Sequence, residues 1–302
     1  MKQNPRQAPI RLINKNNCLV RLVASLIMVY CIPLSLSAQQ AEVLPYYTLG
    51  VFPYLPPARI ESMYAPVAAN LSTVSDKPVK LKSRPDFDAF LQEVKKGRYD
   101  IIFIQPFDYV RIPNKHLYTP IVRWQGMLQA VFVTNADVDL QNTTEAFQLL
   151  RGKEIAMPDK NAAVSLLGKN TLMQAGLSID DDITIHYNKN HFECLKQVVL
   201  KKAFACVTAI PPLTLFESRT DSKLKIIAKS QQIPTPLFAV HERVPKKVLT
   251  NMQTTMENWH LETEGKTILK LLGFHAFVST NDDMYDSVRK MWKNLSESKS
   301  QN

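Results

Sequence analysis

Residues 87–110 read FDAFLQEVKKGRYDIIFIQPFDYV, and this stretch decides the fold. Its first half places apolar side chains at the i, i+3, i+4 and i+7 spacing of a helix face, namely Phe87, Phe90, Leu91 and Val94. Gly97 follows as a helix stop, because glycine readily adopts the left-handed backbone that ends many helices. The continuous apolar run 99–104 then predicts a strand that is covered on both faces.

Strands and helices alternate on both sides of this stretch. Further strands are predicted at 47–51, 79–82, 131–134, 153–156, 183–186, 204–208, 224–228 and 237–241. Further helices are predicted around 64–71, at 144–150, at 163–175, from about 192, and at 245–260, 263–272 and 283–295. A helix between two strands implies a parallel sheet with right-handed crossovers, so the fold class is α/β.

The length of 302 residues suits two domains. We expect lobe I to comprise about 46–125 and 237–302, and lobe II about 129–232. The chain crosses between them twice, near Gly126 and near 234–236, and we expect these crossings to act as hinges. A ligand held between two such lobes would drive hinge closure.

The N-terminal segment explains much of the positive charge. Residues 1–38 carry five basic side chains and no acidic one, and the apolar run 22–32 is followed by Pro33 and small residues. This order is typical of a secretory signal peptide, with cleavage expected after Ser37 or Ala38. A retained anchor is the alternative. The rest of the chain has 32 basic and 27 acidic residues, scattered without a basic arm, which argues against nucleic-acid binding.

The sequence contains none of three common catalytic and phosphate-binding motifs. There is no GxSxG nucleophile elbow, no HExxH metal motif and no GxxxxGK[ST] loop. We therefore expect no catalytic residue and no cofactor. The cysteines that remain after signal removal are Cys194 and Cys206, and export makes them a disulfide candidate. Zinc bound by these cysteines with His186 and His191 is the alternative, and two buried free thiols are a third.

Candidate ligand contacts lie at the carboxyl ends of predicted strands, where open α/β sheets bind ligands. Three loops there are rich in aromatic residues, and the candidates are Phe52, Tyr54, Phe107, Tyr109 and Trp124. Packing of each aromatic into its own core is the alternative. If they face a ligand together, they form one wall of an inter-lobe site.

Helix N-termini in lobe II are expected to form the opposite wall of this inter-lobe site. Free N–H groups at such ends favour an anion, and the candidates here are Asn161, Ser165, Asn190 and His191. Asn190 is equally suited to cap its helix. His191 could likewise be a capping or packing residue.

The order of these motifs resembles the phosphonate-binding-protein-like family, the periplasmic components of ABC transporters for phosphate, phosphite and phosphonate. The resemblance extends from about Tyr47 to Trp292. Its most specific parts are GRYDIIFIQPFDYV and the pair NHFECLK and ACVTA. It implies a type II periplasmic binding protein fold with an anion on a Ser/Thr-rich helix N-terminus, a histidine at the start of the next helix, and aromatic residues from the first lobe.

By this resemblance, His191 matches the family's histidine, and Phe107 and Tyr109 match its aromatic loop. Ala162 and Ala163 replace the hydroxyl residues, and Phe204 replaces an aspartate that is frequent in the family. The ligand is thus left open between phosphonate, carboxylate, a sulfur oxyanion and a less charged molecule.

Taken together, the sequence predicts a periplasmic, monomeric solute-binding protein, not an enzyme, that delivers a small ligand to an ABC transporter permease. A ligand sensor for a membrane receptor and a metal-binding or enzymatic variant of the same fold are the alternatives.

Overall fold

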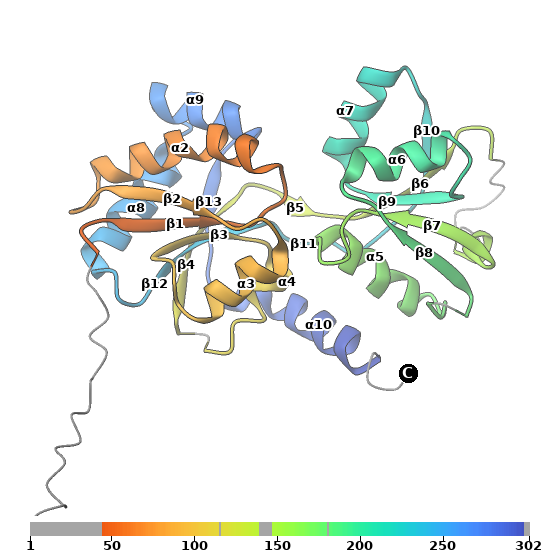
Figure 1. Cartoon of the computed structure of the whole chain (residues 1–302), viewed down its shortest axis with the longest axis horizontal. Helices are drawn as coiled ribbons and strands as arrows, with labels where there is room; N and C mark the ends of the chain where they lie inside the picture. The colour runs from red at the N-terminus through yellow and green to blue at the C-terminus, as the bar shows by residue number, and fades with distance from the viewer. Residues whose placement is uncertain (1–43, 115, 139–146, 180, 299–302) are drawn as a thin grey trace, which may run out of the picture. The chain divides into compact units, whose positions relative to one another are not determined.

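The computed structural model describes residues 44–114, 116–138, 147–179 and 181–298. These residues belong to one compact unit that begins at Leu44. The unit has two lobes, each built on its own β-sheet with helices packed against it (Figure 1). The predicted signal peptide, residues 1–38, lies outside the described residues. Within the described part of the chain, no helix has the length and apolar character needed to cross a membrane.

Lobe I contains a six-stranded mixed sheet of order β13-β4-β12-β3-β1-β2. Its strands are β1 (Tyr47–Val51), β2 (Val79–Ser83), β3 (Ile101–Ile104), β4 (Tyr118–Trp124), β12 (Leu237–His241) and β13 (Phe277–Ser279). β1 pairs in parallel with β2 and β3, as the βαβ pattern predicts, whereas β12 and β13 pair antiparallel with β4. Every residue of β1, β3 and β12 is buried, so the continuous apolar runs do mark the centre of the sheet.

The helices of lobe I cover this sheet. They are α2 (Pro57–Thr73), α3 (Phe87–Lys95), α4 (Pro106–Tyr109), α8 (Lys246–Asn258), α9 (Thr263–Leu272), the 3₁₀ turn η3 (Asp283–Tyr285) and α10 (Asp286–Ser298). In α3, the Asp86 carboxylate accepts a hydrogen bond from the Ala89 amide at 2.7 Å and caps the helix. Gly97 has φ +65°, the left-handed conformation expected of the helix stop.

Two segments of lobe I that the sequence predicts as loops are regular structure, which corrects the prediction. Residues 106–109 form α4, because Pro106 at its first position has its φ fixed near the helical value. Arg123 and Trp124 end strand β4, whose edge β13 covers. Both β4 and β13 are absent from the prediction, because β4 contains Pro120 and polar residues and lacks a continuous apolar run.

Lobe II contains a five-stranded sheet of order β10-β6-β9-β7-β8. Its strands are β6 (Val131–Asn135), β7 (Lys153–Met157), β8 (Ile183–Tyr187), β9 (Ala205–Thr208) and β10 (Leu224–Lys229). β7 pairs in parallel with β8 and β9, whereas β6 is antiparallel to β9 and β10. The three strands β7, β8 and β9 therefore end at the same edge of the sheet.

A helix follows each of these three strands. They are α5 (Ala163–Gln174), α6 (His191–Val199) and α7 (Ile210–Thr220). α7 is missing from the prediction, because its IPPLTLF start has two prolines and no polar cap. Of the predicted helix 144–150, residues 144–146 lie outside the described residues, and Gln148–Leu150 form the 3₁₀ turn η2.

Two short strands lie where the chain crosses between the lobes. β5 (Met127–Leu128) pairs antiparallel with β11 (Ile233–Pro234). Along the chain, β5 lies between β4 of the first sheet and β6 of the second, and β11 lies between β10 of the second sheet and β12 of the first. Gly126 precedes β5 with φ +108°, a conformation that favours glycine. Movement about these two strands stays a prediction.

Candidate ligand-binding site

The carboxyl edge of the lobe II sheet brings three helix N-termini together. α5, α6 and α7 start within a few residues of the ends of β7, β8 and β9. The first N–H groups of a helix have no partner inside the helix, and the helix dipole adds partial positive charge there. The starts of α5 and α6 are therefore suited to an anionic or strongly polar ligand, whereas Pro211 and Pro212 leave the first turn of α7 without two of its N–H groups.

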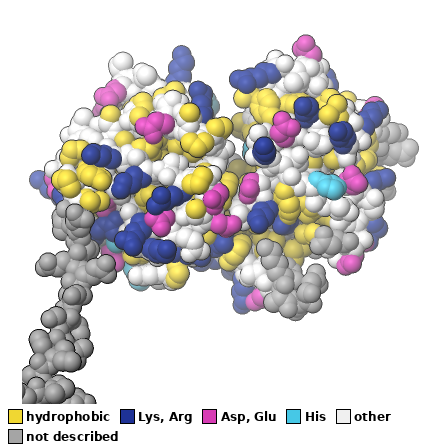
Figure 2. Space-filling view, in the orientation of Figure 1, with side chains coloured by type: hydrophobic (Ala, Val, Ile, Leu, Met, Phe, Trp, Pro, Cys, Tyr) yellow, Lys and Arg dark blue, Asp and Glu magenta, His cyan; other side chains and the backbone are white. Residues whose placement is uncertain are grey.

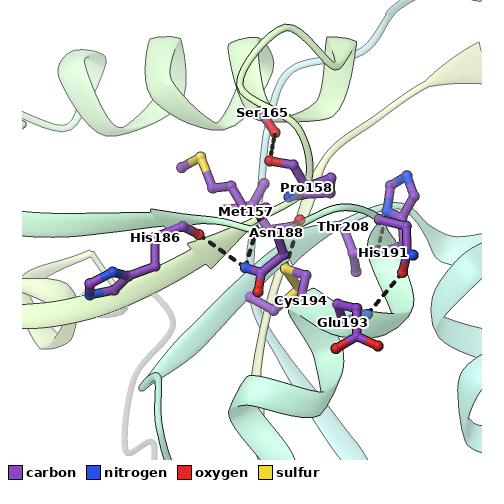
Figure 3. The surroundings of a disulfide bond; sticks show 12 residues. Met157, Pro158, Ser165, His186, Asn188, His191, Glu193, Cys194 and Thr208 are labelled. Atoms are coloured by element: carbon purple, nitrogen blue, oxygen red, sulfur yellow. Dashed lines mark hydrogen bonds between the residues drawn. A yellow bond between two sulfur atoms is a disulfide. The ribbon is translucent and has the colours of Figure 1, made fainter. Parts of the chain in front are cut away.

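His191 and Thr208 meet at this edge. His191 is the first residue of α6, and its Nδ1 lies 2.8 Å from Oγ1 of Thr208, the last residue of β9 (Figure 3). Burial lowers the pKa of His191 to about 4, because the charged imidazolium would lose its water. The imidazole is therefore neutral near pH 7 and has one N–H donor and one acceptor nitrogen. The contact with Thr208 engages Nδ1 and leaves Nε2 for another group.

The Asn190 side chain caps α6. Its Oδ1 accepts a hydrogen bond from the Glu193 amide at 3.0 Å, which is the alternative that the sequence left open. Ser165 is fully buried, and its hydroxyl donates to the Pro158 carbonyl at 3.4 Å, a long hydrogen bond (Figure 3). Ligand contacts of Asn190 and Ser165 remain predictions.

The first turn of α5 receives a side chain from lobe I. The N-cap, Ala162, has no side chain that could cap the helix. Instead, Oε1 of Gln105 accepts a hydrogen bond from the Ala163 amide at 2.9 Å, and Nε2 of Gln105 donates to the Asn161 carbonyl at 2.8 Å. Asn161 thus takes part through its backbone.

A buried carboxylate fixes the Gln105 amide. Asp108, only 1% exposed, accepts a hydrogen bond from Gln105 Nε2 at 2.7 Å and one from Arg111 Nη1 at 3.2 Å. Burial raises the pKa of Asp108 to about 6, and the hydrogen bonds from Gln105 and Arg111 oppose that shift. Its two oxygens accept from different donors, Oδ2 from Gln105 and Oδ1 from Arg111, which orients the Gln105 nitrogen toward Asp108.

The aromatic candidates of lobe I fall into two groups. Phe52, Tyr54 and Trp124 surround Phe103, with ring-centre distances of 5.3, 6.4 and 6.1 Å. Trp124 also stacks on Phe274 at 4.4 Å. Phe52 is buried, whereas Tyr54 and Trp124 are half-buried. These three residues form one aromatic cluster within lobe I.

Phe107 and Tyr109 lie elsewhere in the same core. Phe107 is fully buried, and Tyr109 is 4% exposed. The Tyr109 hydroxyl donates to Asp282 Oδ1 at 2.6 Å, and its ring packs edge-on against Tyr285 at 5.2 Å. Burial and the Asp282 carboxylate both raise the pKa of Tyr109. Contact of Phe107 or Tyr109 with a ligand remains a prediction.

Gln105, Asp108 and Thr208 are three polar residues of this region that the sequence analysis did not select as ligand contacts. A signal for Gln105 and Asp108 is present, since both lie in the QPFDY segment directly after a buried strand. Thr208 ends the apolar strand β9 and has no such flanking pattern.

Cys194 lies in the first turn of α6, and Cys206 lies in β9. Their sulfur atoms are 2.01 Å apart and form a disulfide, with a Cα–Cα distance of 5.7 Å (Figure 3). Sulfurs bonded to each other are not thiolate ligands, so the zinc alternative is not the arrangement seen. Among the described residues, no three His, Cys, Asp or Glu side chains form a group that could hold a metal ion.

Charges of both signs are distributed over the surface. On the face drawn in Figure 2, Lys and Arg side chains lie on both lobes with Asp and Glu among them. On this face, charges of both signs are thus mixed.

Comparison with known proteins adds a family and a fold. The family model described as "ABC transporter, phosphonate, periplasmic substrate-binding protein" matches residues 49–285. A binding-protein component of an ABC phosphonate transporter from Pseudomonas aeruginosa is 14% identical, with 82% of this chain and 85% of that chain covered and a TM-score of 0.67.

Two further solved structures share the fold. PhnD1 from Prochlorococcus marinus, in complex with methylphosphonate, is 13% identical over 83% of this chain and 98% of its own, with a TM-score of 0.72. A Xanthomonas citri protein bound to ATP is 12% identical over 84% of this chain and 99% of its own, with a TM-score of 0.66. At these identities the likeness establishes the two-lobe fold alone.

Proposed function

Because this chain belongs to the family of periplasmic substrate-binding proteins of phosphonate ABC transporters, we propose that it captures a small oxyanion between its lobes. It is a substrate-binding protein and not an enzyme, and its partners are a small molecule and a transporter permease. Residues 1–38 would direct its export to the periplasm, where it would act as a monomer.

The observation that carries this proposal is the start of α6 at the carboxyl edge of the lobe II sheet, where His191 contacts Thr208 at the end of β9. A ligand oxygen there would accept hydrogen bonds from first-turn amides of α5 and α6. A neutral His191, held by Thr208 through Nδ1, would offer Nε2 as a further contact. Neither group carries a full positive charge, so the attraction would come from oriented N–H dipoles.

The ligand's charge follows from the same groups. Ala162 and Ala163 supply no hydroxyl, His191 is neutral, and Asp108 is a nearby buried acid. The cationic side chains beside the two N-caps, Lys160 and Lys189, are exposed to water and salt, so they compensate a fully ionised dianion only weakly. We therefore place a singly charged oxyanion, such as a phosphonate monoanion or a carboxylate, ahead of sulfate.

Isothermal titration calorimetry of the purified protein with methylphosphonate, acetate and sulfate tests this proposal. We expect a saturable heat with at least one singly charged oxyanion, and binding of sulfate at least tenfold weaker. The proposal is contradicted if none of the three anions binds, or if sulfate binds most tightly.

Two variants locate the site. His191→Ala removes the imidazole and should weaken binding of the anion that the wild-type protein prefers by about tenfold or more, the effect of one buried hydrogen bond to a charged group. His186→Ala is the matched control, because His186 is exposed in β8 of the same lobe. Equal losses in both variants would count against the edge as the binding site.

A further inference from the structure

Gln105 connects the two lobes directly. It follows β3 in lobe I, its side chain is almost fully enclosed at 2% residue exposure, and its amide contacts two residues of lobe II. The partners Asn161 and Ala163 are 56 and 58 residues away in sequence, at distances of 2.8 and 2.9 Å. We call these two hydrogen bonds the Gln105 bridge.

The Gln105 bridge is oriented from the lobe I side. Gln105 Nε2 also donates to Asp108 at 2.7 Å, and Asp108 is held in turn by Arg111, whose guanidinium lies 4.5 Å from the Trp292 ring centre. The Asn161 carbonyl can only accept and the Ala163 amide can only donate, so the amide nitrogen faces Asp108 and Asn161 and the amide oxygen faces Ala163. The glutamine is thus preset to present an acceptor to lobe II.

The acceptor lies at the first turn of α5, where a ligand could also bind. Ala163 is the first residue of α5, and a first-turn amide has no partner within its own helix. Ala162 supplies no cap, and the Gln105 oxygen satisfies the Ala163 amide instead. This amide is one of the groups that would bind a ligand oxygen under the proposed function. Under the proposed function, the Gln105 oxygen therefore occupies the place that a ligand oxygen would take.

We propose that Gln105 is an internal competitor of the ligand, which holds the lobes together in the ligand-free protein and must leave the Ala163 amide when an oxyanion binds. That Gln105 holds the lobes together concerns the free protein alone. That it competes with an oxyanion rests on the proposed function. A competitor inside the protein lowers apparent affinity by the fraction of molecules in which it is bound.

Small-angle X-ray scattering of the ligand-free protein tests whether Gln105 holds the lobes together. Gln105→Ala removes both hydrogen bonds to lobe II and should increase the radius of gyration, because the lobes then separate more often. Gln105→Met keeps a similar side-chain volume without hydrogen-bonding capacity, so it should behave alike even if the alanine variant folds poorly. Gln253→Ala on α8 is the matched control, since its amide contacts Glu257 and Ser279 of lobe I.

Unchanged scattering in both folded Gln105 variants would overturn the proposal, as would an equal change in Gln253→Ala.

Calorimetry with methylphosphonate then tests whether Gln105 competes with the ligand. We expect Gln105→Met to bind it about threefold to tenfold more tightly than wild type, the equivalent of about one net hydrogen bond. Equal or weaker binding would overturn the competition.

The two proposals fail in distinguishable ways. If neither wild type nor variant binds methylphosphonate or the other oxyanions, the proposed function is contradicted. The scattering comparison decides independently whether Gln105 holds the lobes together.

Discussion

The carboxyl edges of the two sheets carry opposite kinds of side chain, and the structure treats them differently. In lobe I, aromatic residues after β1 and β3 pack back into the core, so that Phe52 and Phe107 are 6% and 0% exposed. In lobe II, the residues after β7 and β8 are mostly polar or small, and they lie at the starts of α5 and α6, whereas the apolar Ile210 follows β9. A place at the end of a strand thus does not by itself expose a side chain at the edge of its sheet.

The difference has a physical cause. An aromatic ring gains free energy when its apolar surface leaves water, so it packs into the nearest core. An amide at a helix N-terminus has no partner inside the helix and needs one from outside. The first turn of α5 in lobe II therefore needs an acceptor from outside the helix, and lobe I supplies it, because Gln105 accepts from the Ala163 amide.

The largest effect is expected from the lobe I core. Phe107→Ala should lower the free energy of unfolding by about 3–5 kcal/mol, the usual cost of emptying a fully buried phenylalanine site. Urea denaturation followed by circular dichroism measures the loss. A variant with wild-type stability and abolished methylphosphonate binding would break the comparison, because it would make Phe107 a ligand contact and not a core residue.

The disulfide should give the next largest effect, and only in lobe II. The double variant Cys194→Ala, Cys206→Ala should lose about 3 kcal/mol, because the bridge closes a loop over a sequence separation of 12 in the unfolded chain. Among the described residues these are the only cysteines, so hydrogen exchange with reductant present should increase in lobe II and stay unchanged in lobe I.

Mass spectrometry checks the bridge itself. The unreduced protein should resist alkylation at Cys194 and Cys206, and the fragment that holds both should be two hydrogens lighter than the dithiol. Alkylation of both thiols without reductant would rule the bridge out.

The smallest effect compares one helix cap from each lobe. Asn190→Ala in lobe II and Asp86→Ala in lobe I should each lower stability by about 1 kcal/mol, because each removes the side-chain acceptor of a first-turn amide. Asn190→Ser retains a capping oxygen and should restore most of the loss. Thermal unfolding measures all three variants.

Ligand affinity separates the two roles of Asn190. If Asn190 only caps α6, the serine variant should bind methylphosphonate as the wild type does. A serine variant that keeps its stability but loses affinity would show that the amide nitrogen also contacts the ligand.

Much of the fold could be predicted because it depends on local patterns. The helix 263–272 and the strand 47–51 have the predicted bounds, since a run of helical or strand spacing with clear stops on either side defines both. β4 and α7 could not be predicted in this way. Their sequences contain prolines and mixed polarity, and both are stabilised by packing against other elements, β12 beside β4 and α6 beside α7.

The candidate site was predictable in position but not in detail. The histidine at the start of α6 follows from the motif that contains it, and its place at a strand edge follows from the α/β alternation. Its partner Thr208 does not, because the contact spans 17 residues and depends on how β9 lies beside α6. The same holds for Gln105, whose partners are more than 50 residues away.

The sequence by itself determined the alternation of strands and helices, the two-lobe α/β class and the family, because periodicity and short motifs are local properties of the chain. Only the tertiary structure decided which edge residues are buried and which polar groups meet. Burial and hydrogen bonding depend on distances between residues far apart in sequence, and the packing of the sheets sets those distances. That is why Phe107 lies in a core while Gln105, two residues earlier, extends from one lobe to the first turn of α5 in the other.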